Sequence, residues 1–284
     1  MTKTFKHSGD MGDIIYSIPT IQRLGGGILY LDPTGGDGDE FQPFLDANRW
    51  RDGKKVTKFN QKSIDFLLPL LKVQKCLDEV VVWDGQEVDY NLNQHRTLFR
   101  THHPMNLAEQ HRKAFGVSDR PWVEKTLISV LPPWLDIPVS GDAESKAIVS
   151  RSLRYHSQMH VWNGFFDHNW DGISDGVFIG TDLEHEVFNT NFCPDPLPKQ
   201  EVKDALEMAQ AIHTAPHFWG NQSLPFALAM GAGSPSSWLE VCAFAPNTLF
   251  QREKVFISSA DGGTFCTTDM DRSKFSPMVN GAMR

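Results

Sequence analysis

Hydrophobic and polar positions near the N-terminus follow first a helical and then a strand pattern. Ile14, Ile18 and Ile21 recur at the spacing of one helix face, and three consecutive glycines follow them. A short apolar run comes next, at 28–31. The pattern predicts a strand–helix–strand unit over 4–31. Such units build parallel sheets that helices cover on both faces, with ligands at the carboxyl ends of the strands.

The same alternation continues along most of the chain. The stretch 33–60 is rich in glycine and charge and predicts a long loop with one short helix. The proline-rich stretch 129–138 has no period and predicts a linker. The other expected elements are helices over 63–76, 102–115, 182–189, 198–212 and 221–230, and strands over 79–83, 88–92, 146–153 and 176–180. The sequence therefore predicts an α/β protein with an N-terminal domain over 1–140 and a second domain over 141–284.

Composition excludes several classes of protein. The 284 residues are 40% hydrophobic and 22% charged, which is enough for two globular cores. Because 27 basic residues face 35 acidic ones, the net charge of -8 has the wrong sign for coating nucleic acid. No apolar run approaches a membrane span, the N-terminus lacks a signal-peptide core, and the four cysteines show no C-x-x-C spacing. We expect a cytoplasmic protein without a transmembrane segment or structural zinc.

A glycine-rich turn joins the first predicted strand to the first predicted helix. Gly9 and Gly12 leave room for a ligand to approach the backbone, and Asp13 falls in the first turn of the helix. Two roles fit Asp13: a carboxylate beside a ligand, or a helix cap, whose loss costs about 1 kcal/mol. The glycine spacing is not G-x-G-x-x-G, so it does not predict a dinucleotide site.

Three polar segments of the second half are candidates for binding a nucleoside diphosphate. The segment at 221–223 stands at the start of a predicted helix, where backbone N–H groups suit an anion. The segment at 151–154 carries two guanidinium groups that can bind phosphate, and the carboxylate at 184 can bind the hydroxyls of a ribose. Each also has an ordinary structural interpretation, as a capped helix, a solvated surface or a helix-start charge. The candidate donor-binding residues are Asn221, Gln222, Ser223, Arg151, Arg154 and Glu184.

Two weaker patterns suggest metal binding. The segment 32–40 has the composition of a calcium loop but lacks the alternating ligand register of an EF-hand. The adjacent histidines at 102–103 and the pair His156 and His160 have no third ligand at a suitable spacing. We therefore expect no metal site.

Three segments, in this order, resemble the heptosyltransferase-like group of inverting GT-B glycosyltransferases. Residues 11–21 (MGDIIYSIPTI) resemble the group's first loop and helix, 176–188 its middle segment of the second domain, and 221–231 its donor-phosphate helix. The resemblance implies two facing Rossmann-like domains with a cleft between them. It also implies that the first domain binds the acceptor, that the second binds a nucleotide sugar, and that no metal or other cofactor is required.

The resemblance further implies a mechanism. Asp13 matches the aspartate of the M-G-D motif, the general base that removes the proton of the acceptor hydroxyl as its oxygen attacks the anomeric carbon and inverts it. The helix N–H groups and the arginine pair would neutralise the departing diphosphate. The chain departs from the group at the phosphate helix, where Asn221, Gln222, Ser223 and Phe226 replace Asp, Thr or Ser, Gly and His.

Several activities remain open from the sequence. The first expectation is a metal-independent glycosyltransferase, hexosyl- or heptosyltransferase-like, with a nucleotide sugar and a hydroxyl-bearing saccharide as its partners. Within this class, the acceptor could instead be a hydroxymethylated DNA base, as for some phage enzymes. The altered phosphate helix also motivates a nucleotide-sugar-binding protein without turnover. An epimerase on the same fold is the last alternative.

Overall fold

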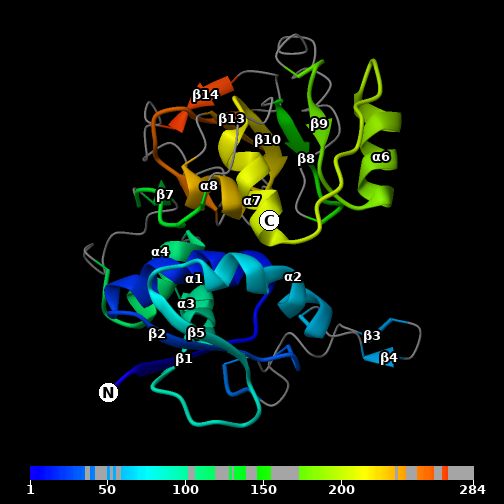
Figure 1. The fold of residues 1–284 in the computed structure, drawn as a ribbon. Helices are drawn as coiled ribbons and strands as arrows, with labels where there is room; N and C mark the ends of the chain where they lie inside the picture. The colour runs from blue at the N-terminus through cyan, green and yellow to red at the C-terminus, as the bar shows by residue number, and fades with distance from the viewer. Residues whose placement is uncertain are drawn as a thin grey trace. The chain divides into compact units, whose positions relative to one another are not determined.

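The computed structural model divides into two compact units, each with its own sheet (Figure 1). Unit 1 is Met1–Lys125 with Asp204–Leu206, and unit 2 is Thr126–Lys203 with Glu207–Arg284. The division falls earlier in the chain than the expected boundary at 140. The described residues are 1–35, 39–41, 50–51, 54–55, 59–101, 106–118, 128–129, 131–138, 146–154, 173–233, 236–240, 248–258 and 264–267.

Unit 1 is built on a parallel sheet with the strand order β5–β2–β1–β6. Its strands are β1 (Lys3–His7), β2 (Gly27–Leu31), β5 (Leu77–Val82) and β6 (Tyr90–Asn91). β1 pairs with β2 along its whole length, from Lys3 opposite Gly27 to His7 opposite Leu31. The predicted strand–helix–strand opening is confirmed.

Helical elements also occur among the described residues of unit 1, and the one over 95–101 was not predicted. They are α1 (Met11–Arg23), α2 (Gln61–Lys72), the 3-10 turn η1 (Leu92–Gln94), α3 (His95–Thr101) and α4 (Leu107–Ala114). Ile14, Ile18 and Ile21 of α1 are fully buried. After α1, Gly27 has a φ of 148°, and a Cβ there would collide with the carbonyl oxygen of Lys3, so only glycine fits. α4 packs against both α1 and α3.

Three expected elements of unit 1 differ from those observed. The helix expected over 102–115 begins only at Leu107, because the Asn106 side chain caps it by accepting the N–H of Ala108. The strand expected over 88–92 is limited to β6, since the chain turns into η1 at Leu92. The expected loop at 33–60 contains an antiparallel pair, β3 (Trp50–Arg51) and β4 (Lys54–Lys55).

Unit 2 is built on a six-stranded sheet with the order β14–β13–β11–β10–β8–β9. All of its pairings are parallel except that of β13 with β14. The strands are β8 (Ile148–Ser150), β9 (Val177–Phe178), β10 (Phe218–Asn221), β11 (Ser237–Glu240), β13 (Val255–Ser258) and β14 (Thr264–Cys266). A separate parallel pair joins β7 (Ile128–Ser129) to β12 (Leu249–Phe250).

The helices among the described residues of this half are α6 (Asp182–Phe192), α7 (Ala205–Thr214) and α8 (Leu224–Ala232). An aromatic core joins α6 to the sheet, with Phe188 of α6 buried beside Phe178 of β9 and Trp219 of β10. Trp219 also stacks on Trp238 of β11 at 3.8 Å between ring centroids. Within the described part of the chain, no helix combines the length and the apolar character needed to cross a membrane.

Three segments of the second half differ from the elements that the sequence predicted. The helix expected over 221–230 is the strand β10 up to Asn221 and then α8 from Leu224. The helix expected over 198–212 begins only at Ala205, because Lys199 forms a parallel bridge to Phe178 in extended conformation. The stretch 129–138 is part of unit 2: it begins in β7, and the backbone N–H of buried Trp134 donates to the carbonyl of Gly231.

Candidate active site

The strand orders define one topological switch point in each unit. In unit 1, β1 lies between β2 and β6, so the chain adds strands first on one side of β1 and then on the other. In unit 2, β8 lies between β9 and β10 in the same way. Open α/β sheets bind ligands outside the carboxyl ends of the strands at such points. The candidate sites are therefore the residues that follow β1 and β6 in unit 1 and β8 and β10 in unit 2.

Asp13 lies at the switch point of unit 1, in the first turn of α1. Its side chain is 21% exposed, and its Oδ2 lies 3.5 Å from Nη2 of Arg96. Gly9 packs beside this pair, since a Cβ there would lie 2.6 Å from the same Nη2 and 3.1 Å from the same Oδ2. Gly12 is half-buried in the first turn of α1. The Asp13 carboxylate is thus accessible beside a glycine turn, and its role as a general base stays a prediction.

Asn93 connects the end of β6 to the end of β1. Its Oδ1 accepts the backbone N–H of Ser8 at 3.2 Å and Nη1 of Arg96 at 2.7 Å. Its Nδ2 donates to Ser8 Oγ at 2.7 Å and to Asp39 Oδ2 at 2.9 Å. These four bonds satisfy both polar atoms of the amide, which is fully buried. The amide therefore has one orientation, with its oxygen toward Arg96.

A buried cation continues this network on the other side of Asn93. Lys6 is only 8% exposed, and its Nζ lies 2.9 Å from Asp39 Oδ2 and 4.1 Å from the centroid of the Trp83 ring. Burial raises the pKa of Asp39, but hydrogen bonds from Asn91, Asn93 and Lys6 outweigh it and lower the pKa below its usual value. The carboxylate of Asp39 is thereby held ionised as an anchor for Asn93.

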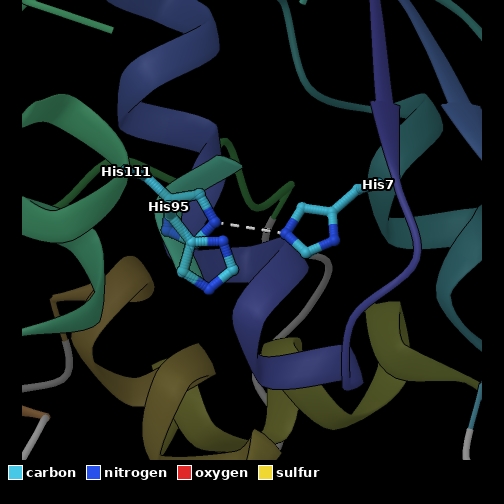
Figure 2. A group of neighbouring side chains, drawn as sticks. All are labelled: His7, His95 and His111. Atoms are coloured by element: carbon cyan, nitrogen blue, oxygen red, sulfur yellow. Dashed lines mark hydrogen bonds between the residues drawn. The ribbon is translucent and has the colours of Figure 1, made fainter. Parts of the chain in front are cut away.

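Three buried histidines form a cluster beside the glycine turn. His7 ends β1, His95 begins α3 and His111 lies in α4, and Figure 2 shows the His7 ring facing the other two. The His95 and His111 rings stack at 3.8 Å between centroids, and Nε2 of His7 lies 3.2 Å from Nε2 of His111. Burial lowers the pKa of all three rings, that of His111 to about 3. The cluster is therefore neutral at physiological pH.

Hydrogen bonds assign one proton to each of these rings. The N–H of Gly9 donates to Nδ1 of His7 at 2.9 Å, so the proton of His7 is on Nε2 and donates to His111. Nδ1 of His95 donates to the carbonyl of Leu92, and Nδ1 of His111 donates to that of Leu107. Each ring thus has a backbone partner and a fixed tautomer.

The same cluster is a group of described residues whose ligand atoms are close enough to share a metal ion, all within 4.8 Å of one another. Two of the three rings already use a lone pair, on Nδ1 of His7 and on Nε2 of His111. A metal ion would have to replace the proton between them, so the arrangement is complete as a neutral hydrogen-bonded cluster. The histidines at 102–103, 156 and 160 lie outside the described residues. The expectation of no metal site stays a prediction.

Arg151 follows β8 at the switch point of unit 2, in a buried ion pair. Its Nε and Nη2 donate to the two carboxylate oxygens of Glu240, at 2.8 and 3.1 Å, and its guanidinium lies over the Phe192 ring. Arg151 is 4% exposed and Glu240 is 3% exposed. The pair ties the end of β8 to the end of β11. Arg154, three residues on, is exposed. Phosphate binding by either arginine stays a prediction.

Asn221 ends β10, and its side chain bonds to the backbone of Ser152, which follows the neighbouring strand β8. Its Oδ1 accepts the N–H of Ser152, and its Nδ2 donates to the carbonyl of Ser152 at 2.8 Å. Gln222 is buried, and Ser223 is the N-cap of α8 without a side-chain cap hydrogen bond. The first turn of α8 therefore has no side-chain oxygen of Ser223 on its N–H groups.

Glu184 forms a capping box at the start of α6. Its Oε2 accepts the N–H and the hydroxyl of Thr181, both at 2.9 Å, and its own N–H donates to Thr181 Oγ1 at 3.3 Å. These contacts match the helix-start interpretation of this carboxylate. Binding of a ribose by Glu184 stays a prediction.

Sequence reasoning missed several of the polar residues at the unit 1 switch point. Arg96, Asn93 and His95 lie in the polar run that follows the expected strand 88–92. Because β6 is parallel to β1, the end of this run meets the glycine turn. The placement of a polar run directly after a strand was the signal that could have found them. His7 and His111 had no comparable signal, since their partners are distant in sequence.

Comparisons with known proteins support a shared fold. No protein-family model matches the chain, and no curated protein matches it in sequence. The iron-containing dodecameric glycosyltransferase TibC from enterotoxigenic E. coli H10407 matches with a TM-score of 0.52 and 14% identity, over 99% of this chain and 74% of that one. The TibC heptosyltransferase complex with ADP-D-β-D-heptose matches with a TM-score of 0.50 and 12% identity, over 98% and 75%. A glycosyl transferase of family 9 from Veillonella parvula DSM 2008 has a TM-score of 0.49 and 9% identity, over 89% and 84%. The chain therefore has the α/β fold of the glycosyltransferase TibC.

Proposed function

We propose that this protein is an inverting glycosyltransferase that moves a sugar from a nucleoside diphosphate sugar to a hydroxyl group. The observation that carries the proposal is the position of Asp13, a partly exposed carboxylate at the switch point of unit 1. The fold shared with TibC supports it. The proposal includes the GT-B arrangement, in which the two units face one another and take the acceptor and the donor respectively.

The proposed reaction uses Asp13 as the general base. Its carboxylate accepts the proton of the acceptor hydroxyl while the hydroxyl oxygen attacks the anomeric carbon. The bond from that carbon to the phosphate oxygen breaks on the opposite face, so the configuration inverts. The nucleoside diphosphate leaves with the electron pair of the broken bond.

The start of α8 is the proposed diphosphate site of unit 2. Ser223 places no side-chain cap on this helix, and Pro225 has no N–H, so the first-turn donors after the cap are the N–H groups of Leu224 and Phe226. Together with the helix dipole they attract negative charge. In this proposal they stabilise the leaving diphosphate, and the reaction needs no divalent metal.

The donor and acceptor classes follow from the same proposal. Because TibC forms a complex with ADP-D-β-D-heptose, an ADP-linked sugar is the first donor to test. Saccharide hydroxyls are the first acceptors, and hydroxymethylated bases of DNA are the second class.

A nucleotide-sugar-binding protein without turnover is the second candidate. The observation that favours it is the buried Arg151–Glu240 pair, because Glu240 holds a guanidinium that would otherwise neutralise the leaving diphosphate during turnover. The two candidates differ in whether a product forms after the donor binds.

The test compares the wild type with Asp13→Asn and with a control in the same turn, Asp10→Asn. ADP-D-β-D-heptose serves as the donor, with saccharide and hydroxymethylcytosine-DNA acceptors, and mass spectrometry measures the product. Asp13→Asn should lose roughly 10²–10⁴-fold in turnover and still bind ADP, since general-base catalysis contributes about that much. Asp10→Asn should keep its turnover.

Two outcomes would contradict the proposed role of Asp13 or the proposed transfer reaction. Full turnover in a folded Asp13→Asn protein would remove Asp13 as the base. ADP binding by the wild type without transfer to either acceptor class would favour the second candidate.

A further inference from the structure

Arg96 contacts the candidate base from a fixed position. Its Nη1 donates to Asn93 Oδ1 at 2.7 Å, and its Nη2 lies 3.5 Å from Asp13 Oδ2. The guanidinium is a rigid planar fork, so fixing one nitrogen also fixes the direction of the other. The side chain of Arg96 is 14% exposed, which places its charge at the edge of the protein interior.

The partner that holds Arg96 has no freedom to turn. A rotated Asn93 amide would present its NH₂ group to the Arg96 donor and its oxygen to the Asp39 carboxylate, and both contacts would be repulsive. The Lys6–Asp39 ion pair anchors the far side of this amide. Lys6 and Asp39 therefore hold the Asn93 amide in place, and the amide in turn holds Arg96.

The Asp13 carboxylate lies beside Arg96 in the glycine turn, 3.5 Å from its Nη2. The three histidines beside it are neutral, and the charge of Arg96 itself contributes to lowering the pKa of His7, His95 and His111 after burial, the main cause. Gly9 permits the close approach, since any Cβ there would collide with the guanidinium.

We propose that Arg96, held by Asn93, is the positioning residue of the candidate base: it keeps the Asp13 carboxylate ionised and in one orientation toward the acceptor. An opposite charge within about 4–6 Å favours the ionised form of a carboxyl group. Its catalytic consequence rests on the proposed function, whereas its effect on Asp13 does not.

The first experiment follows the ionisation of Asp13 directly and requires no substrate. Carboxyl-¹³C NMR titrations of aspartate-labelled protein are compared for the wild type, Arg96→Met and Arg96→Lys, with Asp13→Asn to assign the signal. Arg23→Met, at the exposed last turn of α1, is the matched control. The Asp13 midpoint should rise by about one pH unit in Arg96→Met, rise less in Arg96→Lys and stay unchanged in the control.

An unchanged Asp13 midpoint in Arg96→Met would overturn the proposal. If that variant does not fold, Arg96→Gln takes its place, because its amide can still donate to Asn93 while the charge is lost. The same criterion applies to it.

The second experiment is kinetic. In Arg96→Met we expect kcat to fall at least tenfold with the KM for the donor unchanged, the acidic limb of the rate profile to move to higher pH, and Arg96→Lys to restore part of the rate. A fall in donor affinity alone, with kcat and the profile unchanged, would contradict positioning. A shifted midpoint without any transfer would mean that the proposed function fails while the effect on Asp13 stands.

Discussion

The switch points of the two units lie at equivalent places in their sheets, but they differ in whether their polar side chains are partly exposed or already bonded to other protein groups. In unit 1, side chains from β1, η1, α1 and α3 converge and leave the Asp13 carboxylate partly exposed. In unit 2, the polar side chains already have protein partners, since Arg151 pairs with Glu240 and Asn221 bonds to the backbone of Ser152. The first place therefore offers side-chain chemistry, and the second offers the backbone N–H groups of α8. This difference agrees with the proposal that unit 1 takes the acceptor and unit 2 the donor.

The largest expected effect is on the acid stability of unit 1. The folded cluster resists protonation because burial lowers the pKa of His7, His95 and His111, the last to about 3. An unfolded chain takes up these protons below about pH 6.5, so stability is present above that pH and falls as the pH drops toward 3. Between pH 7 and 4, His111 alone should account for roughly 3 kcal/mol of that loss. Urea unfolding of the wild type and of His111→Gln between pH 7 and 4 measures it.

His111→Gln removes the titrating ring while an amide can still accept from His7. Its unfolding free energy should depend less steeply on pH than that of the wild type. Equal slopes for the two proteins would contradict the neutral cluster.

The next effect concerns the buried pair of unit 2. Arg151→Met and Glu240→Leu should each destabilise the protein by roughly 3–5 kcal/mol, because each leaves one buried partner uncompensated. Arg151→Met combined with Glu240→Leu should cost less than the sum. Strict additivity in this double-mutant cycle would show that the two residues are not coupled.

Gly9→Ala should have a smaller effect, centred on unit 1. The new Cβ would meet His7 and Arg96 at 2.6 Å, so we expect a loss of about 1–3 kcal/mol from overpacking. Gly85→Ala is the control, since only its φ of 85° opposes the change and nothing lies within 4 Å of the added carbon. It should cost about 1 kcal/mol. Thermal unfolding distinguishes the two, and a harmless Gly9→Ala would mean that the turn is loosely packed.

The smallest expected difference compares two helix starts of unit 2. Thr181→Ala removes the capping box of α6 and should cost about 1 kcal/mol. Ser223→Ala should cost only a few tenths of a kcal/mol, because Ser223 makes no side-chain cap bond to α8. Chemical denaturation of both variants tests this. Equal losses of unfolding free energy in the two variants would show that Ser223 caps α8. The N–H groups at the start of α8 would then not be open to an anion.

The elements that sequence patterns predicted well were those with a full helical or strand period. The buried isoleucines of α1 and the glycines after it specified the opening of unit 1. β10 was missed because it has four residues, includes Gly220 and runs almost directly into α8. As a result Asn221 was placed on a helix, whereas it ends a strand and bonds to Ser152.

The candidate site could be predicted only in part, for a physical reason. Asp13 was found because its turn and helix are local in sequence. Its neighbour Arg96 and the buried pair of Arg151 with Glu240 join residues far apart in the chain, and only the parallel order of the strands brings them together. The charge and spacing of residues within one segment cannot predict contacts with a distant segment.

The measurement that tests the central claim most directly is an amide NMR titration of the isotope-labelled protein with ADP, with and without Mg²⁺. The largest shifts should fall on the amides of Leu224 and Phe226, and they should not require Mg²⁺. The amides of Gly9 and Asp13 should move little until an acceptor is added. Binding that shifts the glycine turn and leaves the start of α8 unchanged, or no binding of ADP at all, would contradict the division between the two switch points.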